Sequence, residues 1–356
     1  MHKILWMIYS FCFLLLSCES KAQIYPGNTW SSMENREAMG WPNTACSEFT
    51  RFIADSTNIT GLVLVHKGQI VMEYGNISEN SYIASCRKSV LALLYGKYVD
   101  NGMIDLDMTL EDLKINDVTK LLPIEKRATI KDLISARSGV YLRASNGGDF
   151  RRFAPERGSV EPGSHWLYNN WDFNVAGYIF EQETQSNIYD EINSQLALPL
   201  QMQDWDRGLQ KKSGNKELSK FPAYHMWFST RDMARMGLLM LRNGKWKEKQ
   251  IIPKDWVHEV LKQRTSYLEA QKSVPLLKKD GLDLGYGYMW WLIENTTDLR
   301  LKNAYSAQGA LGQNITVYPE IDVVLAFKTN SIYRRRNSIQ TQMKVIRKAV
   351  EIYNAP

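Results

Sequence analysis

Short apolar runs separated by polar turns characterise both ends of the chain. The runs at residues 61–65, 69–74, 315–317 and 323–326 are rich in aliphatic residues, which is typical of β-strands. The segments 44–54 and 338–353 predict two helices that would cover these strands. We therefore expect the two ends of the chain to meet in one antiparallel sheet flanked by helices.

The middle of the chain follows a helical pattern instead. Residues 85–281 favour helices over strands, and the segment 230–241 is amphipathic and ends at Asn243-Gly244. The predicted fold class is therefore α/β (α+β), an antiparallel sheet with a largely helical inserted subdomain.

These two parts are expected to form one domain over residues 41–356. Its sheet would come from about 41–84 and 282–356, and its helical part from about 85–281. A ligand site would lie between the sheet and the helices, which is a common place for a cleft. Residues 18–40 would form an N-terminal tether.

The N-terminus resembles an export signal. His2 and Lys3 precede an apolar run, residues 4–16, which is too short to span a bilayer and is typical of a signal peptide. Leu15-Leu16-Ser17-Cys18 then resembles a bacterial lipobox, with a signal peptide at 1–17 and a lipid-modified Cys18; ordinary cleavage after Ala22 is the alternative. We expect an exported protein of the bacterial periplasm or cell envelope, anchored to the membrane if the lipobox is used.

Composition narrows the class of protein further. The chain has 44% hydrophobic residues and a net charge of +6 that is spread along its length, without the basic stripe that nucleic-acid binding requires. The histidines and cysteines lack metal-ligand spacing, so we expect no metal and no cofactor. Beyond Cys18 only Cys46 and Cys86 remain, and we expect two free thiols. No protein partner is indicated.

The most informative motif is Ser85-Cys86-Arg87-Lys88 at the start of an apolar stretch that extends to Tyr98. A serine and a lysine three apart on a helix lie on one face, so the amine can reach the hydroxyl. Burial would lower the lysine pKa and make the amine a usable base for an activated nucleophile. The alternative is a helix N-cap serine followed by a surface lysine.

The same four-residue spacing occurs again at Ser213-Gly214-Asn215-Lys216. This copy lies in a polar, glycine-interrupted segment without an apolar face, and we expect it to be a solvated loop. The motif alone is therefore weak evidence.

Two further segments support the interpretation of Ser85 and Lys88 as a catalytic pair. Tyr168-Asn169-Asn170 follows a Pro-Gly turn and would place a phenol and a carboxamide where a loop enters a helix. Near the C-terminus, the segment 307–313 contains two glycines. A glycine-rich edge strand there would let a substrate approach closely and would offer the backbone N–H of Ala310 as an oxyanion donor.

With these residues the chain resembles the serine β-lactamase and penicillin-binding-protein superfamily, most closely the class C branch with its related esterases, D-amino-acid peptidases and nylon-oligomer hydrolases. The resemblance covers nearly all of the chain after the signal region. It extends to four more segments, Gly61–Gly68, Thr129–Val140, Phe228–Arg235 and Tyr286–Trp291.

The resemblance implies a role for each site residue. Ser85 would be the acylated nucleophile, Lys88 its proton partner and Tyr168 the second acid/base group. Asn170 would contact a substrate amide and the lysine, and the backbone N–H groups of Ser85 and Ala310 would form the oxyanion hole. Which of Lys88 and Tyr168 is the general base stays open. Cys86 as nucleophile is the less favoured alternative.

One departure from the family pattern bears on the substrate. Penicillin-recognising members have Lys-Thr-Gly or His-x-Gly where this chain has Ala307-Gln308-Gly309, so the cation that would meet a substrate carboxylate is missing. Gln308 and Gly309 would still bind substrate, and the substrate is expected to be a neutral small-molecule ester or amide. A compensating arginine from 334–336 is the alternative.

The predicted function is therefore that of an exported serine hydrolase acting through an acyl-enzyme. The alternatives are a cell-wall D-peptidase or weak β-lactamase, and a catalytically silent binding or sensor lipoprotein. The loop 143–159 contains Arg151, Arg152 and Arg157 and is either a lid that samples an anionic group of the substrate or a solvated connection. Of five tryptophans near the motifs (Trp166, Trp171, Trp227, Trp290 and Trp291), one or two are expected to face the cleft.

Overall fold

The computed structural model describes residues 23–355 except 280, 331 and 333. The predicted signal peptide and Cys18 lie outside the described residues. At the centre of the described chain is a seven-stranded sheet in the order β2-β1-β13-β12-β11-β10-β9. Its strands are β1 (Gly61–His66), β2 (Gln69–Gly75), β9 (Asp283–Tyr286), β10 (Trp291–Glu294), β11 (Tyr305–Gly309), β12 (Gln313–Tyr318) and β13 (Val323–Lys328).

All neighbouring strands of this sheet are antiparallel, and the register pairs Gly61 with Lys328 across β1 and β13. The N-terminal hairpin and the C-terminal strands therefore form one continuous sheet, although more than 200 residues separate them in the sequence. The predicted fold class is confirmed.

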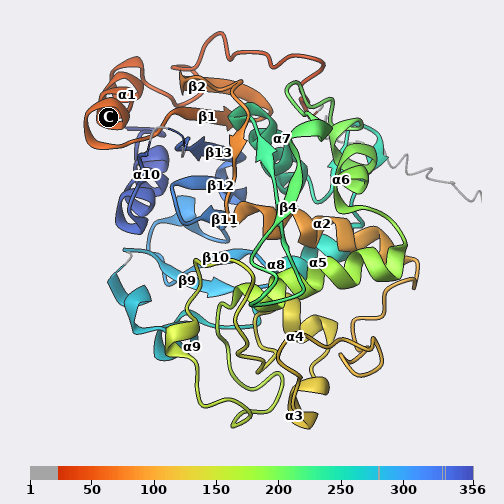
Figure 1. Cartoon of the computed structure of the whole chain (residues 1–356). Coiled ribbons are helices and arrows are strands. Elements are labelled where there is room, and N and C mark those ends of the chain that lie inside the picture. Colours follow the sequence, from red (N-terminus) through yellow and green to blue (C-terminus); the bar gives the residue numbers. More distant parts are fainter. Residues whose placement is uncertain (1–22, 280, 331, 333, 356) are drawn as a thin grey trace, which may run out of the picture.

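Helices cover both faces of the sheet (Figure 1). The helices α1 (Asn43–Ser56) and α10 (Ile339–Glu351) pack together on one side, while α7 (Thr230–Leu241) contacts β1, β12 and β13 from the other. All residues of β1, β12 and β13 are buried. This double burial explains why the central strands read as continuous apolar runs, because neither face of them meets water.

The rest of the chain is mainly helical and lies against one end of the sheet (Figure 1). It contains α2 (Cys86–Asp100), α3 (Pro123–Lys126), α4 (Ile130–Ile134), α5 (Asn170–Thr184), α6 (Ile188–Glu191), α8 (Lys254–Leu261) and α9 (Tyr267–Ser273). Short two-stranded ribbons join β3 (Ser81–Tyr82) to β6 (Trp227–Phe228), β4 (Lys211–Ser213) to β5 (Ala223–His225), and β7 (Lys245–Trp246) to β8 (Lys249–Gln250). The second serine-lysine copy is exposed, as expected, but its Ser213 ends β4 rather than lying in a loop.

The segment expected to form a tether is described from residue 23, and its residues 31–33 pair with the outer edge of β2. Met33 N–H donates to Ile70 O at 2.8 Å, and Ile70 N–H donates to Ser31 O at 2.9 Å. Gly68, in the tight turn between β1 and β2, has φ +82°, and a Cβ there would lie 2.0 Å from Ile24 O. The segment thus covers backbone groups that an edge strand would otherwise leave unpaired.

Helix α2 passes through the middle of the molecule. The sequence indicates an apolar stretch after Ser85, and every residue from Cys86 to Gly96 is buried. Hydrogen bonds fix its position: Ser89 Oγ donates to Met289 O at 2.6 Å, and Tyr95 Oη donates to Ala176 O at 2.7 Å. A helix held on all sides is a rigid support for the residues at its N-terminus.

In the described part of the chain, no helix is both long enough and apolar enough to cross a membrane.

Candidate active site

Ser85 occupies the position just before the first turn of α2. It is half-buried, whereas the residues that follow it are buried. The preceding residue, Ala84, has φ +49°, a left-handed conformation that costs free energy in a non-glycine residue and often occurs at functional sites. The Ser85 side chain makes no capping hydrogen bond. This disagrees with the N-cap interpretation and leaves the hydroxyl available for chemistry.

Lys88 projects from the next turn of α2 toward this hydroxyl. Its Nζ donates to Ser85 Oγ at 2.8 Å and to Tyr168 Oη at 2.7 Å. Only 1% of Lys88 is exposed. Burial, followed by the charge of neighbouring Arg87, holds the pKa of Lys88 well below its usual range, and Asp149 acts in the opposite direction. The buried amine therefore favours the neutral form.

Tyr168 comes from the loop that enters α5, and it reaches the site because that loop is pinned to the helical part. Leu167 N–H donates to Ala136 O at 2.9 Å, and Phe150 N–H donates to Tyr168 O at 3.0 Å. The Tyr168 ring stacks on Trp291 with centroids 5.7 Å apart. Burial raises the pKa of Tyr168 above its usual range, so its phenol keeps its proton at neutral pH.

Asn170, the third residue of the Tyr-x-Asn triplet, begins α5 but makes no hydrogen bond to Lys88 in the described structure. Its Nδ2 donates to Gly147 O at 2.8 Å, and its backbone N–H donates to Asp149 Oδ2 at 3.2 Å. The expected contact with the lysine is therefore wrong here, because the loop 143–159 takes up the carboxamide. Its Oδ1 is buried without a partner and remains free to accept a hydrogen bond.

The segment Ala307-Gln308-Gly309 forms the end of β11. This strand was expected at the edge of the sheet, but it lies between β10 and β12. Its pairing with β10 nevertheless stops at Ser306, opposite Trp291. From Ala307 onward β11 is unpaired on that side, because β10 begins at Trp291, and Gln308 and Gly309 line the pocket there.

The backbone N–H groups of Ser85 and Ala310 are both free of acceptors within the described chain. Gly309 and Ala310 line the same pocket as Ser85. A Cβ at Gly309 would lie 2.7 Å from Gln313 Oε1 and 3.0 Å from Ile83 O. Only glycine therefore lets this strand approach the segment before the nucleophile, which places two unused backbone donors beside one cavity.

That cavity has a volume of about 260 Å³. Sequence reasoning identified five of its lining residues, Ser85, Tyr168, Gln308, Gly309 and Ala310, and included Trp291 among the candidates for the cleft. It missed Gly148, Asp149, Phe150, Ile339 and Gln342 as pocket residues. The sequence marks the loop 143–159 by its arginines and the helix 338–353 by its apolar pattern. Neither pattern indicates which side chains of the loop or helix reach the pocket.

The arginines that the sequence offered as alternative substrate contacts do not line this pocket. Arg334, Arg335 and Arg336 are exposed. Arg157, from the loop 143–159, is bound by Glu125 at 2.7 Å. No arginine therefore replaces the missing third-motif cation among the lining residues, and the loop reaches the pocket through Gly148, Asp149 and Phe150.

The tryptophans near the motifs mostly belong to the core. Trp166, Trp171 and Trp290 are at most 1% exposed, and Trp227 is half-buried on β6. Trp291 alone of the five lines the pocket, which agrees with the expectation that one or two would face it.

Both remaining cysteines are free and buried, as expected. Burial raises the pKa of the Cys86 thiol far above neutrality. A thiol that stays protonated and inaccessible is a poor nucleophile, so the geometry favours Ser85 over Cys86.

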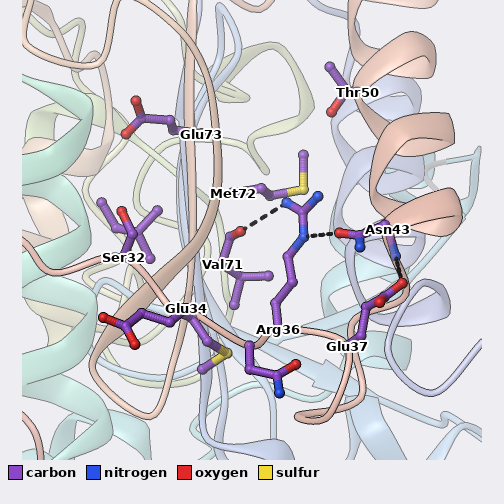
Figure 2. Close-up of a pocket in the computed structure, with 12 residues that line it drawn as sticks. Ser32, Glu34, Arg36, Glu37, Asn43, Thr50, Val71, Met72 and Glu73 are labelled. Atoms are coloured by element: carbon purple, nitrogen blue, oxygen red, sulfur yellow. Dashed lines mark hydrogen bonds between the residues drawn. The ribbon is translucent and has the colours of Figure 1, made fainter.

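A larger pocket of about 580 Å³ lies on the opposite part of the sheet, between residues 32–37, α1 and β2. Figure 2 shows Arg36 held in it by Asn43 Oδ1 at 2.7 Å and by Val71 O at 3.4 Å. None of the predicted site residues lines this pocket, and its arginine is already bound. The candidate active site is therefore the smaller pocket.

Comparison with known proteins agrees with this fold. A putative 6-aminohexanoate-dimer hydrolase from Bacillus anthracis has 19% identity and a TM-score of 0.62, over 86% of this chain and 82% of that one. A putative β-lactamase from Bacteroides dorei has 18% identity and a TM-score of 0.62, over 88% and 99%. EstCE1, a hydrolase with promiscuous acyltransferase activity, has 15% identity and a TM-score of 0.62, over 88% and 98%.

At these identities the structural similarity establishes the fold alone. The sequence itself matches the family model described as Beta-lactamase over residues 51–345, which includes every predicted catalytic and substrate-binding residue. The chain therefore belongs to the beta-lactamase family.

Proposed function

We propose that this protein is an exported serine hydrolase that cleaves an ester or amide through an acyl-enzyme on Ser85. The observation that carries the proposal is the position of Lys88 Nζ, which lies within hydrogen-bond distance of both Ser85 Oγ and Tyr168 Oη. A buried amine between a hydroxyl and a phenol can pass a proton from one to the other. The family match supports the same class of chemistry.

In the acylation step, Ser85 Oγ attacks the substrate carbonyl carbon and transfers its proton to Lys88 Nζ. The backbone N–H groups of Ser85 and Ala310 stabilise the resulting oxyanion. The bond to the leaving alcohol or amine then breaks, and the leaving group takes a proton through Tyr168. Water cleaves the acyl-Ser85 ester in the second half of the cycle and restores the free hydroxyl.

The electrostatics favour Lys88 as the general base. Its lowered pKa provides a neutral amine with a free electron pair, while the raised pKa of Tyr168 keeps the phenol protonated and able to donate. Tyr168 would then deliver the proton to the leaving group, and Lys88 would restore it.

The substrate carbonyl is proposed to belong to an ester or amide without a carboxylate beside it. Gln308 stands where penicillin-recognising members have a cation, and no lysine or arginine lines the pocket. Gln308 Nε2 is buried without a partner, so it can donate a hydrogen bond to a neutral carbonyl but cannot neutralise a carboxylate. Export remains part of the proposal on the strength of the N-terminal sequence alone.

Incubation of residues 19–356 with p-nitrophenyl esters of graded length and with nitrocefin tests this proposal. Ser85→Ala is the control, and mass spectrometry identifies the acylated residue. Ester turnover with Ser85 acylated and nitrocefin intact is the expected result. Rapid nitrocefin hydrolysis would favour the β-lactamase or D-peptidase alternative. If no probe reacts in a Ser85-dependent way, the protein is a silent binding protein.

A further inference from the structure

Among the residues that line the pocket of the proposed hydrolase, one side chain is acidic and none is basic. Asp149 lines the pocket together with Ser85 and Tyr168. Its carboxylate accepts hydrogen bonds from the backbone N–H of Arg151 and of Asn170, each at 3.2 Å. Both partners are neutral, so the negative charge of Asp149 is not neutralised by an ion pair within the described chain.

Aromatic rings surround the same space. Phe150, Tyr168 and Trp291 all line the pocket, and the Tyr168 ring lies 6.0 Å from that of Phe150 and 5.7 Å from that of Trp291. The faces of aromatic rings attract cations, and an aromatic wall beside a carboxylate is a typical environment for a substituted ammonium group. Such walls also exclude water, which strengthens the effect of the carboxylate.

The pocket lining includes a further hydrogen-bond acceptor. Gln342 on α10 lines the pocket and is only 2% exposed. Its Nε2 donates to Asn337 O at 3.5 Å, whereas its Oε1 is buried without a partner. A buried acceptor without a donor costs free energy, and a substrate N–H group would satisfy it.

We propose that Asp149 makes this site selective for esters or amides that carry a positively charged ammonium group a few bonds from the scissile carbonyl. The proposal rests on the proposed hydrolase function and specifies its substrate class. Phe150 and Trp291 contact the hydrocarbon part of the cation, and Asp149 supplies the charge. The same charge repels substrates with a carboxylate, which adds to the effect of Gln308.

A matched pair of thioesters isolates the charge. Butyrylthiocholine and S-(3,3-dimethylbutyl) thiobutyrate have the same shape. The first carries a quaternary nitrogen where the second has an uncharged quaternary carbon. Both reactions are followed by the thiol that hydrolysis releases. We expect kcat/KM to be about tenfold higher for the cation, since a carboxylate with aromatic rings discriminates to that extent. The ratio should shrink as salt is added.

Asp149→Asn tests the residue, with Glu156→Gln as its control. Asparagine keeps the shape and one acceptor oxygen, while Glu156 is an exposed carboxylate of the same loop that does not line the pocket. The cation-to-neutral ratio should fall close to one in Asp149→Asn and stay at the wild-type value in Glu156→Gln. A wild-type ratio of one or less, or an unchanged ratio in Asp149→Asn, would overturn the inference.

The hydrolase proposal and the selectivity proposal fail differently. If neither thioester is cleaved in a Ser85-dependent way, the hydrolase proposal fails for this substrate class. In that case, calorimetry measures the affinity of both thioesters for Ser85→Ala, which tests the selectivity proposal without any hydrolysis. Tighter binding of the cation that is lost in Ser85→Ala/Asp149→Asn supports the role of Asp149, and equal binding of the two compounds contradicts it.

Discussion

Lys88 Nζ lies 2.7 Å from Tyr168 Oη, although the two residues are 80 positions apart in the chain. One comes from a buried helix and the other from a loop held against the helical part. Burial shifts the two pKa values in opposite directions, down for the amine and up for the phenol. Both shifts favour the neutral form of the group, which gives the base and the acid that acyl transfer requires.

Replacing either member of this pair should remove most of the activity. Lys88→Met and Tyr168→Phe are each expected to lower kcat/KM by about 10²- to 10⁴-fold, since each removes a proton-transfer group. Because the two residues act as one unit, the double variant should be little worse than the poorer single variant. Steady-state kinetics on an activated ester measures this; fully additive losses would contradict a shared proton path.

Arg87 should control the pH dependence of the reaction. Its guanidinium is buried over the Tyr224 ring at 4.4 Å and helps to lower the pKa of Lys88. Arg87→Met removes that charge, so the pKa of Lys88 should rise and the acidic limb of kcat/KM should move to higher pH.

Asp149→Asn provides the opposite control for this prediction. The Asp149 carboxylate raises the pKa of Lys88, so its removal should move the acidic limb to lower pH. Both pH profiles are measured with a neutral ester, and circular dichroism confirms that each variant is folded. A limb that does not respond to either change would mean that Lys88 is not the group that titrates.

Restoring the missing cation should shift the substrate range. In Gln308→Lys, an ammonium group would lie beside Ser85 and meet a substrate carboxylate. We expect nitrocefin acylation to increase by about tenfold or more, since a charge-assisted hydrogen bond is roughly twice as strong as a neutral one. Gln308→Met has a similar length without charge and should give no increase. If both variants respond alike, the charge is not the determinant.

Lys328 should make stability depend on pH. It is fully buried at the end of β13, where its Nζ donates to Phe228 O at 2.8 Å and also to Glu79 O. Burial lowers its pKa to about 7, from 10.5. Between these pH values the unfolded chain binds more protons than the folded chain, so the Lys328 contribution to stability rises as the pH increases.

Lys328→Met tests this assignment. Denaturant unfolding of the wild type from pH 7 to pH 10 should show a stability increase that is smaller in the variant. The variant should also be destabilised by about 1–3 kcal/mol at high pH, because two buried carbonyl groups lose their donor. An identical pH dependence of both proteins would show that Lys328 is not the group responsible.

The local features of the fold could be predicted because they depend on neighbouring residues. The helix at Thr230–Leu241 follows from its apolar periodicity and its stop at Asn243-Gly244. The strands β1 and β2 follow from short aliphatic runs. The nucleophile motif is also local, since Ser85 and Lys88 lie one helical turn apart.

Other features depend on contacts that no local pattern encodes. Asn170 bonds to Gly147 rather than to the lysine, because a long loop folds back onto α5. Asp149 and Gln342 reach the pocket from segments nearly 200 residues apart, and β11 has a cleft edge only because its pairing with β10 ends at Ser306. The sequence by itself determined the elements and the nucleophile, through spacing and burial along single helices and strands. Only the tertiary structure decided which charges and acceptors surround that nucleophile, because those positions are fixed by packing between distant parts of the chain.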